Sequence, residues 1–177
     1  MPEVYLAAGS NVDAERHLTL AAAELERVFG PVRFSPWYRN AAVGFDGPDF
    51  INFAAGFATE LPVREVIANL RAIEAICGRP RAAPKWAPRG MDLDILLYDG
   101  LVCDEPGLRI PRPDLVRRAY MLGPLAAIAP DFMHPTAGAT IRELWARFDR
   151  ASHPLERIDP SATSTHSDRR PPRASGR

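Results

Sequence analysis

The sequence predicts an α+β fold, a ferredoxin-like β-α-β-β-α-β core followed by an added hairpin strand and C-terminal helices. Two observations carry this prediction. Short apolar runs that end in turn residues alternate with segments of helical periodicity, and the first six of these segments follow that order. The composition, with 46% hydrophobic and 25% charged residues in a chain of 177, is that of an ordinary globular domain.

Four strands are expected where short apolar runs end in turn residues. They cover residues 4–8, 32–39, 50–59 and 92–98. A glycine-rich loop at 40–49 joins the second strand to the third. After the fourth strand, Asp99-Gly100 is a strong two-residue hairpin signal, so a further strand is expected at 101–103.

Two helices are expected between these strands, where apolar residues recur every three or four positions. The first ends in Phe29 before the stop signal Gly30-Pro31, and either Asn11 or Asp13 can cap its start. The second opens at Pro62 and ends at Gly78. Its apolar stripe is Val66, Ile67, Leu70, Ile73 and Cys77.

Three shorter helices are expected after the hairpin. Asp114 can cap a helix that runs to Tyr120, and a second helix covers 124–128. The last begins at Thr140, which forms a capping box with Glu143. Residues 161–177 contain no large apolar side chain, so we expect a single domain over 1–160 and a disordered tail.

Charge and composition exclude several classes of protein. The 22 basic and 22 acidic residues balance, which disfavours a general nucleic-acid binder. No apolar run approaches the roughly 18 residues of a membrane span, and the N-terminus lacks the basic region of a secretory signal. Cys77 and Cys103 fit no disulfide scaffold or metal pattern, and we expect reduced thiols in a cytoplasmic protein.

Asp92 and Asp94 are the most informative pair of residues. On a strand, positions i and i+2 project to one face roughly 6.5–7 Å apart, while Leu93, Ile95 and Leu97 point the other way. Two neighbouring carboxylates are costly to bury without a cation, so the strand either faces water or binds a positive ion. The two aspartates alone leave both interpretations open.

The preceding loop favours a phosphate ligand with bound metal. Arg79, Arg81, Lys85 and Arg89 place four cations just before the two acids. Carboxylates bind Mg²⁺ through oxygen, and arginine forks bind phosphate oxygens. Trp86 either covers a base or cofactor ring or anchors the loop on the core. The chain contains neither a Walker A motif nor a GxGxxG sequence.

The run Lys85-Trp86-Ala87-Pro88-Arg89-Gly90-Met91-Asp92-Leu93-Asp94-Ile95-Leu96 resembles the signature of the 6-hydroxymethyl-7,8-dihydropterin pyrophosphokinase family of folate biosynthesis. The resemblance extends over residues 4–135. Shorter matching runs lie in the expected order at 5–11, Phe50-Ile51-Asn52, Ile73-Glu74, Ile110-Pro111 and 118–125.

The resemblance implies transfer of pyrophosphate from the co-substrate ATP to the hydroxymethyl group of the pterin, with release of AMP. It implies Arg79, Arg89, Asp92 and Asp94 as catalytic residues, with Asp92 and Asp94 also holding two Mg²⁺ ions. The implied ATP-binding residues are Glu74, Arg79, Arg81, Trp86, Arg89, Ile95, Leu108, Arg109, Arg112 and Arg118. The implied pterin-binding residues are Asn40, Ala41, Val43, Phe50, Asn52, Asp92 and Tyr120.

Small-molecule substrates are thus the expected partners of a monomer that binds neither nucleic acid nor membrane. Two departures from the family pattern stand out. Asn40-Ala41 replaces a frequent Thr-Pro, and Arg112 replaces a histidine that contacts phosphate in many members. Arginine keeps a donor but makes the charge permanent. Two alternatives therefore remain: a paralogue with altered activity, and a non-catalytic RNA-binding or nucleotide-binding module.

Overall fold

The computed structural model describes residues 1–44, 46–78 and 90–160. The expected mixture of helices with an antiparallel sheet is confirmed. The main sheet has the strand order β5-β1-β4-β3-β8, with β2 also paired to β4, and each paired strand is antiparallel to its neighbour. Its strands are β1 (Glu3–Ser10), β2 (Arg33–Phe34), β3 (Trp37–Asn40), β4 (Phe50–Ala58), β5 (Asp92–Tyr98) and β8 (Glu156–Ile158).

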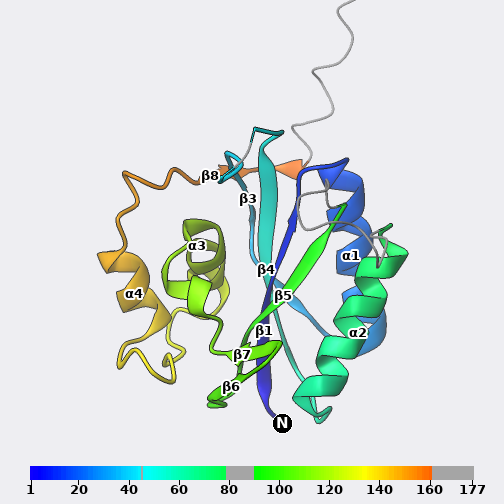
Figure 1. Cartoon of the computed structure of the whole chain (residues 1–177), viewed down its shortest axis with the longest axis vertical. Coiled ribbons are helices and arrows are strands. Elements are labelled where there is room, and N and C mark those ends of the chain that lie inside the picture. The colour runs from blue at the N-terminus through cyan, green and yellow to red at the C-terminus, as the bar shows by residue number, and fades with distance from the viewer. Residues whose placement is uncertain (45, 79–89, 161–177) are drawn as a thin grey trace, which may run out of the picture.

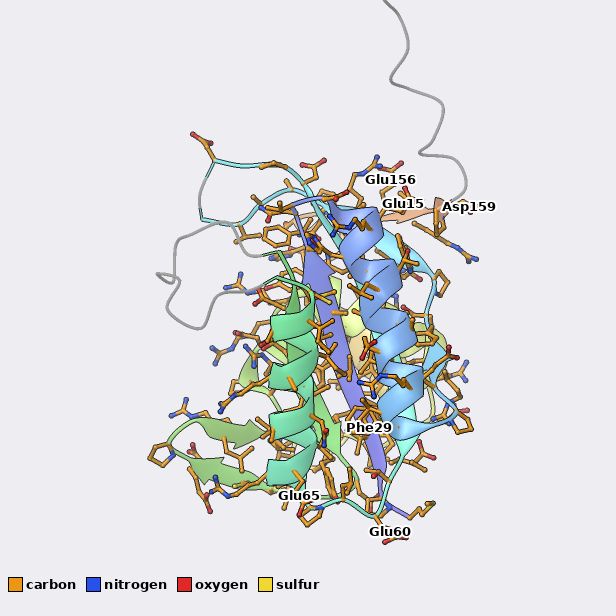
Figure 2. The ribbon with its side chains drawn as sticks, turned by 90° about the vertical axis from the view of Figure 1, so that its right-hand side faces the viewer. Glu15, Phe29, Glu60, Glu65, Glu156 and Asp159 are labelled. Atoms are coloured by element: carbon orange, nitrogen blue, oxygen red, sulfur yellow. The ribbon has the colours of Figure 1, made fainter. Side chains whose placement is uncertain are left out.

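Helices cover both faces of this sheet (Figure 1). The helices α1 (Ala14–Phe29) and α2 (Val63–Ile76) lie side by side on one face (Figure 2). The helices α3 (Ala119–Ile128) and α4 (Ile141–Arg147) lie on the opposite face. Because side chains alternate along a strand, Leu6 of β1 packs into the core under α1 and α2, whereas Tyr5 and Ala7 pack toward α3.

The predicted strand at 32–39 is broken into β2 and β3. Ser35 interrupts it, because its backbone N–H donates to the Ala54 carbonyl while its Oγ accepts from the Ala54 N–H, both at 2.8 Å. Pro36 then has no N–H to continue the ladder. The first helix begins after Asp13, one of the two predicted caps, but Asp13 has a left-handed φ of 44° and its side chain makes no capping bond.

The hairpin prediction was wrong in its position. Asp99-Gly100 does form a tight turn, with the Leu101 N–H donating to the Tyr98 carbonyl at 2.9 Å. However, no pairing between β5 and residues 101–103 is present in the described part of the chain. The hairpin instead joins β6 (Cys103–Glu105) to β7 (Leu108–Ile110) around Pro106-Gly107, where Gly107 has a φ of 77°. A proline followed by a residue with positive φ is typical of a type II turn.

The helix boundaries near residue 114 also differ from the prediction. Asp114 lies inside a 3-10 helix, η1 (Pro113–Val116), and its backbone carbonyl accepts hydrogen bonds from the N–H groups of Arg117 and Arg118. A single helix, α3, then runs through Pro124. The capping box between Thr140 and Glu143 is confirmed at the start of α4. The sequence pattern did not predict β8. The disordered tail predicted for 161–177 lies outside the described residues.

A bulge corrects the expected direction of Leu97. Leu93 and Ile95 pack in the core under α1 and α2, but Leu97 packs on the α3 side together with Leu96. The register between β1 and β5 shifts at this point, because Tyr5 pairs with Leu97 whereas Leu6 pairs with Ile95. The extra residue reverses the alternation beyond it. Asp92 and Asp94 precede the bulge and therefore share one face, as predicted.

His134 provides a test of stability against pH. The side chain is 5% exposed, and its Nδ1 accepts hydrogen bonds from the N–H groups of Thr136 and Ala137 at 3.2 and 3.0 Å. Burial lowers the pKa of His134, so the stability that its neutral form provides is present above about pH 6.5 and is lost as the pH falls through the lower folded-state pKa. The contribution should fall by at most about 1.4 kcal/mol per pH unit.

Urea unfolding at pH 7.5 and pH 5.0 measures this effect. The stability difference between wild type and His134→Gln should be smaller at pH 5.0 than at pH 7.5. His153→Gln is the control, because His153 is exposed and lies in a turn. An equal difference at both pH values would contradict the neutral, buried state of His134.

No helix in the three described ranges combines the length and the apolar character that a membrane span needs. Both cysteines, Cys77 and Cys103, carry free thiols.

Candidate active site

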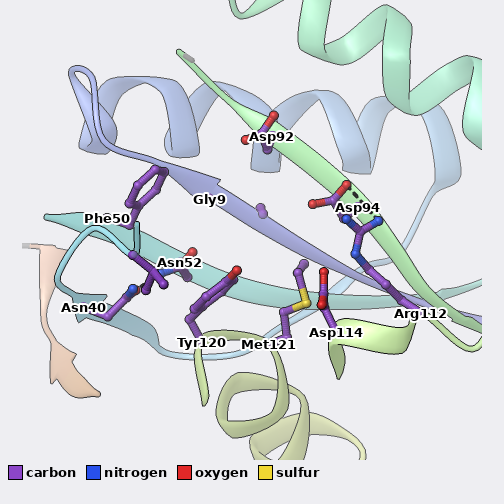
Figure 3. A pocket seen from close by; sticks show the side chains of 13 residues that line it. Gly9, Asn40, Phe50, Asn52, Asp92, Asp94, Arg112, Asp114, Tyr120 and Met121 are labelled. Carbon is purple, nitrogen blue, oxygen red and sulfur yellow. Dashed lines mark hydrogen bonds and ion pairs between the residues drawn. The ribbon is translucent and has the colours of Figure 1, made fainter. Parts of the chain in front are cut away.

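A cavity of about 230 Å³ lies on the α3 face of the sheet, near the end of β1 and the beginnings of β4 and β5 (Figure 3). Its walls come from four parts of the chain that are distant in sequence. The lining residues are Ala7, Ala8, Gly9, Asn40, Val43, Phe50, Asn52, Asp92, Asp94, Arg112, Asp114, Tyr120 and Met121.

Small residues in the central strand create the hollow. Gly9 of β1 pairs with Asp92 on one side and with Asn52 on the other, so these three residues form one row across the sheet. Ala7 pairs with Asp94 in the next row that faces the same way. Because Ala7 and Gly9 project little or nothing above the sheet, the polar side chains on the flanking strands border an open space.

Two hydrogen-bonded amide side chains, Asn52 of β4 and Asn40 of β3, line one side of the cavity. Asn52 is only 4% exposed, and its Nδ2 donates to Asn40 Oδ1 at 2.5 Å. The Nδ2 of Asn40 donates in turn to the Ala41 carbonyl at 3.0 Å. A Cβ atom at Gly9 would lie 2.7 Å from Asn52 Oδ1, so the absence of a side chain at Gly9 makes room for this amide. The arrangement can hold a ligand edge that both donates and accepts hydrogen bonds.

Two aromatic side chains, Phe50 at the start of β4 and Tyr120 in α3, also line the cavity (Figure 3). Burial raises the pKa of the Tyr120 phenol; the nearby Arg118 guanidinium has a smaller effect that lowers this pKa, and the Asp114 carboxylate has a smaller effect that raises it. The phenol is therefore protonated at neutral pH and can donate a hydrogen bond. Flat side chains of this kind provide surfaces against which a planar ring can pack.

A second cleft of about 810 Å³ lies beside the first, between α2, β5 and the β6–β7 hairpin. Glu74, Ile95, Leu108, Arg109 and Arg112, all predicted for ATP, line it together. Glu74 also stabilises β5, because its Oε1 accepts a hydrogen bond from the Leu93 N–H at 2.8 Å. Arg109 forms an exposed ion pair with Asp104 at 2.9 Å.

Asp94 and Arg112 line both cavities, so the two spaces meet at these residues. The Arg112 Nη1 lies 3.2 Å from Asp94 Oδ1, and each side chain is 34% exposed. The Asp94 carboxylate at the junction of the two cavities is therefore already paired with a cationic side chain. Asp92 borders the same cavity from the same face of β5 (Figure 3).

Other predicted residues lie elsewhere. Arg118 and Ala41 line neither cavity, although the Ala41 carbonyl accepts a hydrogen bond from Asn40. The predictions for Arg79, Arg81, Trp86 and Arg89 lie outside the described residues. The flanks of that segment lie close together, because a Cβ at Gly90 would be 3.2 Å from the Cys77 carbonyl oxygen. The Ser10 Oγ also donates to the Gly90 carbonyl.

The sequence interpretation missed five residues that line the smaller cavity, namely Ala7, Ala8, Gly9, Asp114 and Met121. Gly9 was interpreted only as part of a turn, Asp114 only as a helix cap, and Met121 was given no role. The row Asp92–Gly9–Asn52 requires the sheet register, which no local pattern reveals. Met121 follows Tyr120 directly, and this adjacency was the one available signal for it.

The sequence of this chain matches a known family over most of its length. The family profile described as 7,8-dihydro-6-hydroxymethylpterin-pyrophosphokinase (HPPK) matches residues 5–130. The chain belongs to this family. The 2-amino-4-hydroxy-6-hydroxymethyldihydropteridine pyrophosphokinase of Synechocystis is 40% identical over 131 residues, which cover 73% of this chain and 67% of that protein. The protein of the same name from Pseudomonas aeruginosa is 37% identical over 147 residues, covering 81% and 90%.

Solved structures show the same fold. A Plasmodium falciparum HPPK-DHPS triple mutant superposes with a TM-score of 0.67 at 13% identity, over 82% of this chain and 44% of that chain. An HPPK-DHPS in complex with substrates gives a TM-score of 0.63 at 12% identity, over 82% and 43%. The chain thus spans less than half the length of these HPPK-DHPS structures, and at such identity the likeness concerns the fold alone.

Proposed function

We propose that this member of the HPPK family transfers pyrophosphate from ATP to the hydroxymethyl group of 6-hydroxymethyl-7,8-dihydropterin and releases AMP, as a step of folate biosynthesis. The observation that carries the proposal is the meeting of two cavities at Asp94, with Asp92 beside it on the same strand face. A reaction between two substrates requires two adjoining binding spaces and a shared charged group where the reacting atoms meet.

The donor set at the junction fits Mg²⁺. Asp92 and Asp94 offer hard carboxylate oxygens, and Asp94 already accepts a cationic partner in Arg112. Within the described residues, no group of three or more acidic, histidine or cysteine side chains could hold a metal, so phosphate oxygens would complete the ligand set. We propose two ions, which when bound supply neutralisation of the phosphate charge.

The chain's own residues divide the binding work. Phe50 and Tyr120 would hold the pterin ring, while Asn52 and Asn40 would hydrogen-bond its edge. In the larger cleft, Glu74, Ile95 and Leu108 would contact the nucleoside, and Arg109 and Arg112 would contact the phosphates. Arg79 and Arg89 would neutralise the charge that develops on the phosphates, and Arg81 and Trp86 would bind the nucleotide. Arg118 would contribute to ATP binding and Ala41 to pterin binding, although neither residue lines a cavity.

We also propose the layout of the fold, the range of residues needed for activity, the monomeric state and the cellular compartment. The order β5-β1-β4-β3, with antiparallel neighbours and two crossover helices on one face, supports a ferredoxin-like layout. We propose that residues 1–160 suffice for activity, that the enzyme acts as a monomer on small molecules, and that it works in the cytoplasm. Removal of residues 161–177 should leave the rate unchanged.

Product identity tests the proposed reaction. Incubation with Mg-ATP and the pterin alcohol should give AMP and pterin diphosphate in equal amounts, and EDTA should stop the reaction. Formation of ADP with a pterin monophosphate would contradict the reaction type. Formation of AMP only with a different alcohol would favour a paralogue with altered specificity, which Asn40-Ala41 and Arg112 motivate.

Gly9→Ala should selectively weaken pterin binding. The new Cβ would lie 2.7 Å from Asn52 Oδ1 and would displace an amide that is hydrogen-bonded to Asn40. We expect the KM for the pterin to rise about tenfold, the scale of one lost or misaligned hydrogen bond, with little change in the KM for ATP.

Gly100→Ala is the matched control, because nothing lies within 4 Å of a Cβ at that turn position. Steady-state kinetics with each substrate varied in turn provides the measurement. Equal kinetic constants for Gly9→Ala and wild type would show that the amide row is not part of the pterin site.

A further inference from the structure

Arg112 is fixed beside β5 by its main chain. It follows β7 and precedes η1 in an extended conformation, with φ −62° and ψ 126°. Its backbone N–H donates to the Leu96 carbonyl at 2.9 Å. Because Leu96 lies two residues beyond Asp94 on the same strand, the anchored main chain lets the Arg112 side chain reach that carboxylate.

The guanidinium of Arg112 is only partly satisfied. Its Nη1 lies 3.2 Å from Asp94 Oδ1, but its buried Nε has no hydrogen-bond partner among the described residues. A guanidinium presents five N–H donors, and a buried donor without an acceptor is unfavourable. The present contact is therefore not the arrangement in which this side chain makes all its hydrogen bonds.

The charges around the smaller cavity are uneven. Three carboxylates, from Asp92, Asp94 and Asp114, line it. Arg112 is the one cationic side chain among its described lining residues. A divalent ion on Asp94 would take the place of this guanidinium, because two cations at one carboxylate repel each other.

We propose that Arg112 is a built-in counterion of Asp94 that competes with the metal and must leave the carboxylate before the metal binds there. Phosphate oxygens of the arriving nucleotide then accept hydrogen bonds from the released guanidinium, including its Nε. This inference rests on the proposed function in taking Asp94 as a metal ligand. An arginine keeps its positive charge across the physiological pH range, whereas a histidine in its place would lose its charge.

Calorimetric titration of Mn²⁺ into the full-length, nucleotide-free protein tests the proposal. Arg112→Met should bind Mn²⁺ about tenfold more tightly than wild type, the scale of one partly exposed charge interaction. Arg112→Lys, which keeps the charge, should stay within about threefold of wild type. Arg142→Met is the matched control: it removes an exposed arginine that is paired to Asp131 at 2.8 Å and lines neither cavity. It should also stay within about threefold.

Arg112→Gln serves as a second neutral variant if circular dichroism shows that Arg112→Met does not fold. Asp94→Asn identifies the site. If Asp94→Asn abolishes the tighter binding of the neutral variants, the counterion role is supported. If Asp94→Asn weakens Mn²⁺ binding but neutral variants of Arg112 bind like wild type, the inference is overturned and the metal site stands. If Asp94→Asn binds Mn²⁺ like wild type, the metal site itself is wrong, and the inference fails with it.

Discussion

Replacing Asp94 with alanine is expected to reduce the rate of pyrophosphate transfer by at least about a thousandfold while the protein remains folded. Asp94 lies where the two cavities meet, and in the proposal it holds the ions that neutralise the phosphates. The rate of AMP formation at saturating substrates measures the effect.

Asp131→Ala is the matched control for Asp94→Ala. Asp131 is an exposed carboxylate that pairs with Arg142 at 2.8 Å and lines neither cavity. Its loss should leave the rate within about twofold of wild type, because surface ion pairs contribute little. Thermal unfolding of each variant separates loss of chemistry from loss of structure. A folded Asp94→Ala protein with the full rate would refute the metal assignment.

Asn52→Ala should lower kcat/KM for the pterin by about a hundredfold and leave the KM for ATP nearly unchanged. The buried amide bonds to Asn40, and in the proposal it also bonds to the pterin edge, so its loss leaves polar groups on both without a partner. Each unsatisfied buried group costs about 1–3 kcal/mol. Steady-state kinetics with the pterin varied at saturating ATP provides the number.

Asn69→Ala is the corresponding control. Asn69 is half-buried on α2 and lines neither cavity, and its Nδ2 donates to the Glu65 carbonyl at 2.9 Å within the same helix. Its replacement should not alter either kinetic constant beyond about twofold. If Asn52→Ala raised the KM for ATP as much as that for the pterin, the division of the two cavities between the substrates would be wrong.

Local sequence patterns predicted the elements whose boundaries depend on local chemistry. The strand β5 has the predicted limits, because Gly90 and Met91 before it form neither helix nor strand and the tight turn Asp99-Gly100 follows Tyr98. The capping box of α4 was also predictable from the sequence, because the side chains of Thr140 and Glu143 each accept a hydrogen bond from the other's backbone N–H within one turn.

Features that depend on pairing between distant segments could not be predicted. The bulge that turns Leu97 toward α3 arises from the register of β5 on β1. Likewise, the short segment Glu156–Ile158 forms β8 because it pairs with β3 at the edge of the sheet. The split between β2 and β3 depends on the bonds that Ser35 makes to Ala54, which lies in another strand.

The candidate site likewise combines features that the sequence predicted with features that depend on contacts between distant segments. The face shared by Asp92 and Asp94 follows from strand periodicity alone, and the grouping of Asn52, Phe50 and Tyr120 was expected from the resemblance to the family. The contact between Asp94 and Arg112 was not expected, because it depends on how the chain after β7 is fixed along β5. Gly9 was missed because its role lies in the space it leaves for Asn52.

Anomalous diffraction from crystals grown with Mn²⁺, α,β-methylene ATP and the pterin alcohol would test the central claim most directly. We predict manganese peaks bound by the carboxylate oxygens of Asp92 and Asp94, between the phosphate chain and the pterin hydroxymethyl group. Manganese peaks elsewhere, with both carboxylates turned away from the phosphates, would contradict the account.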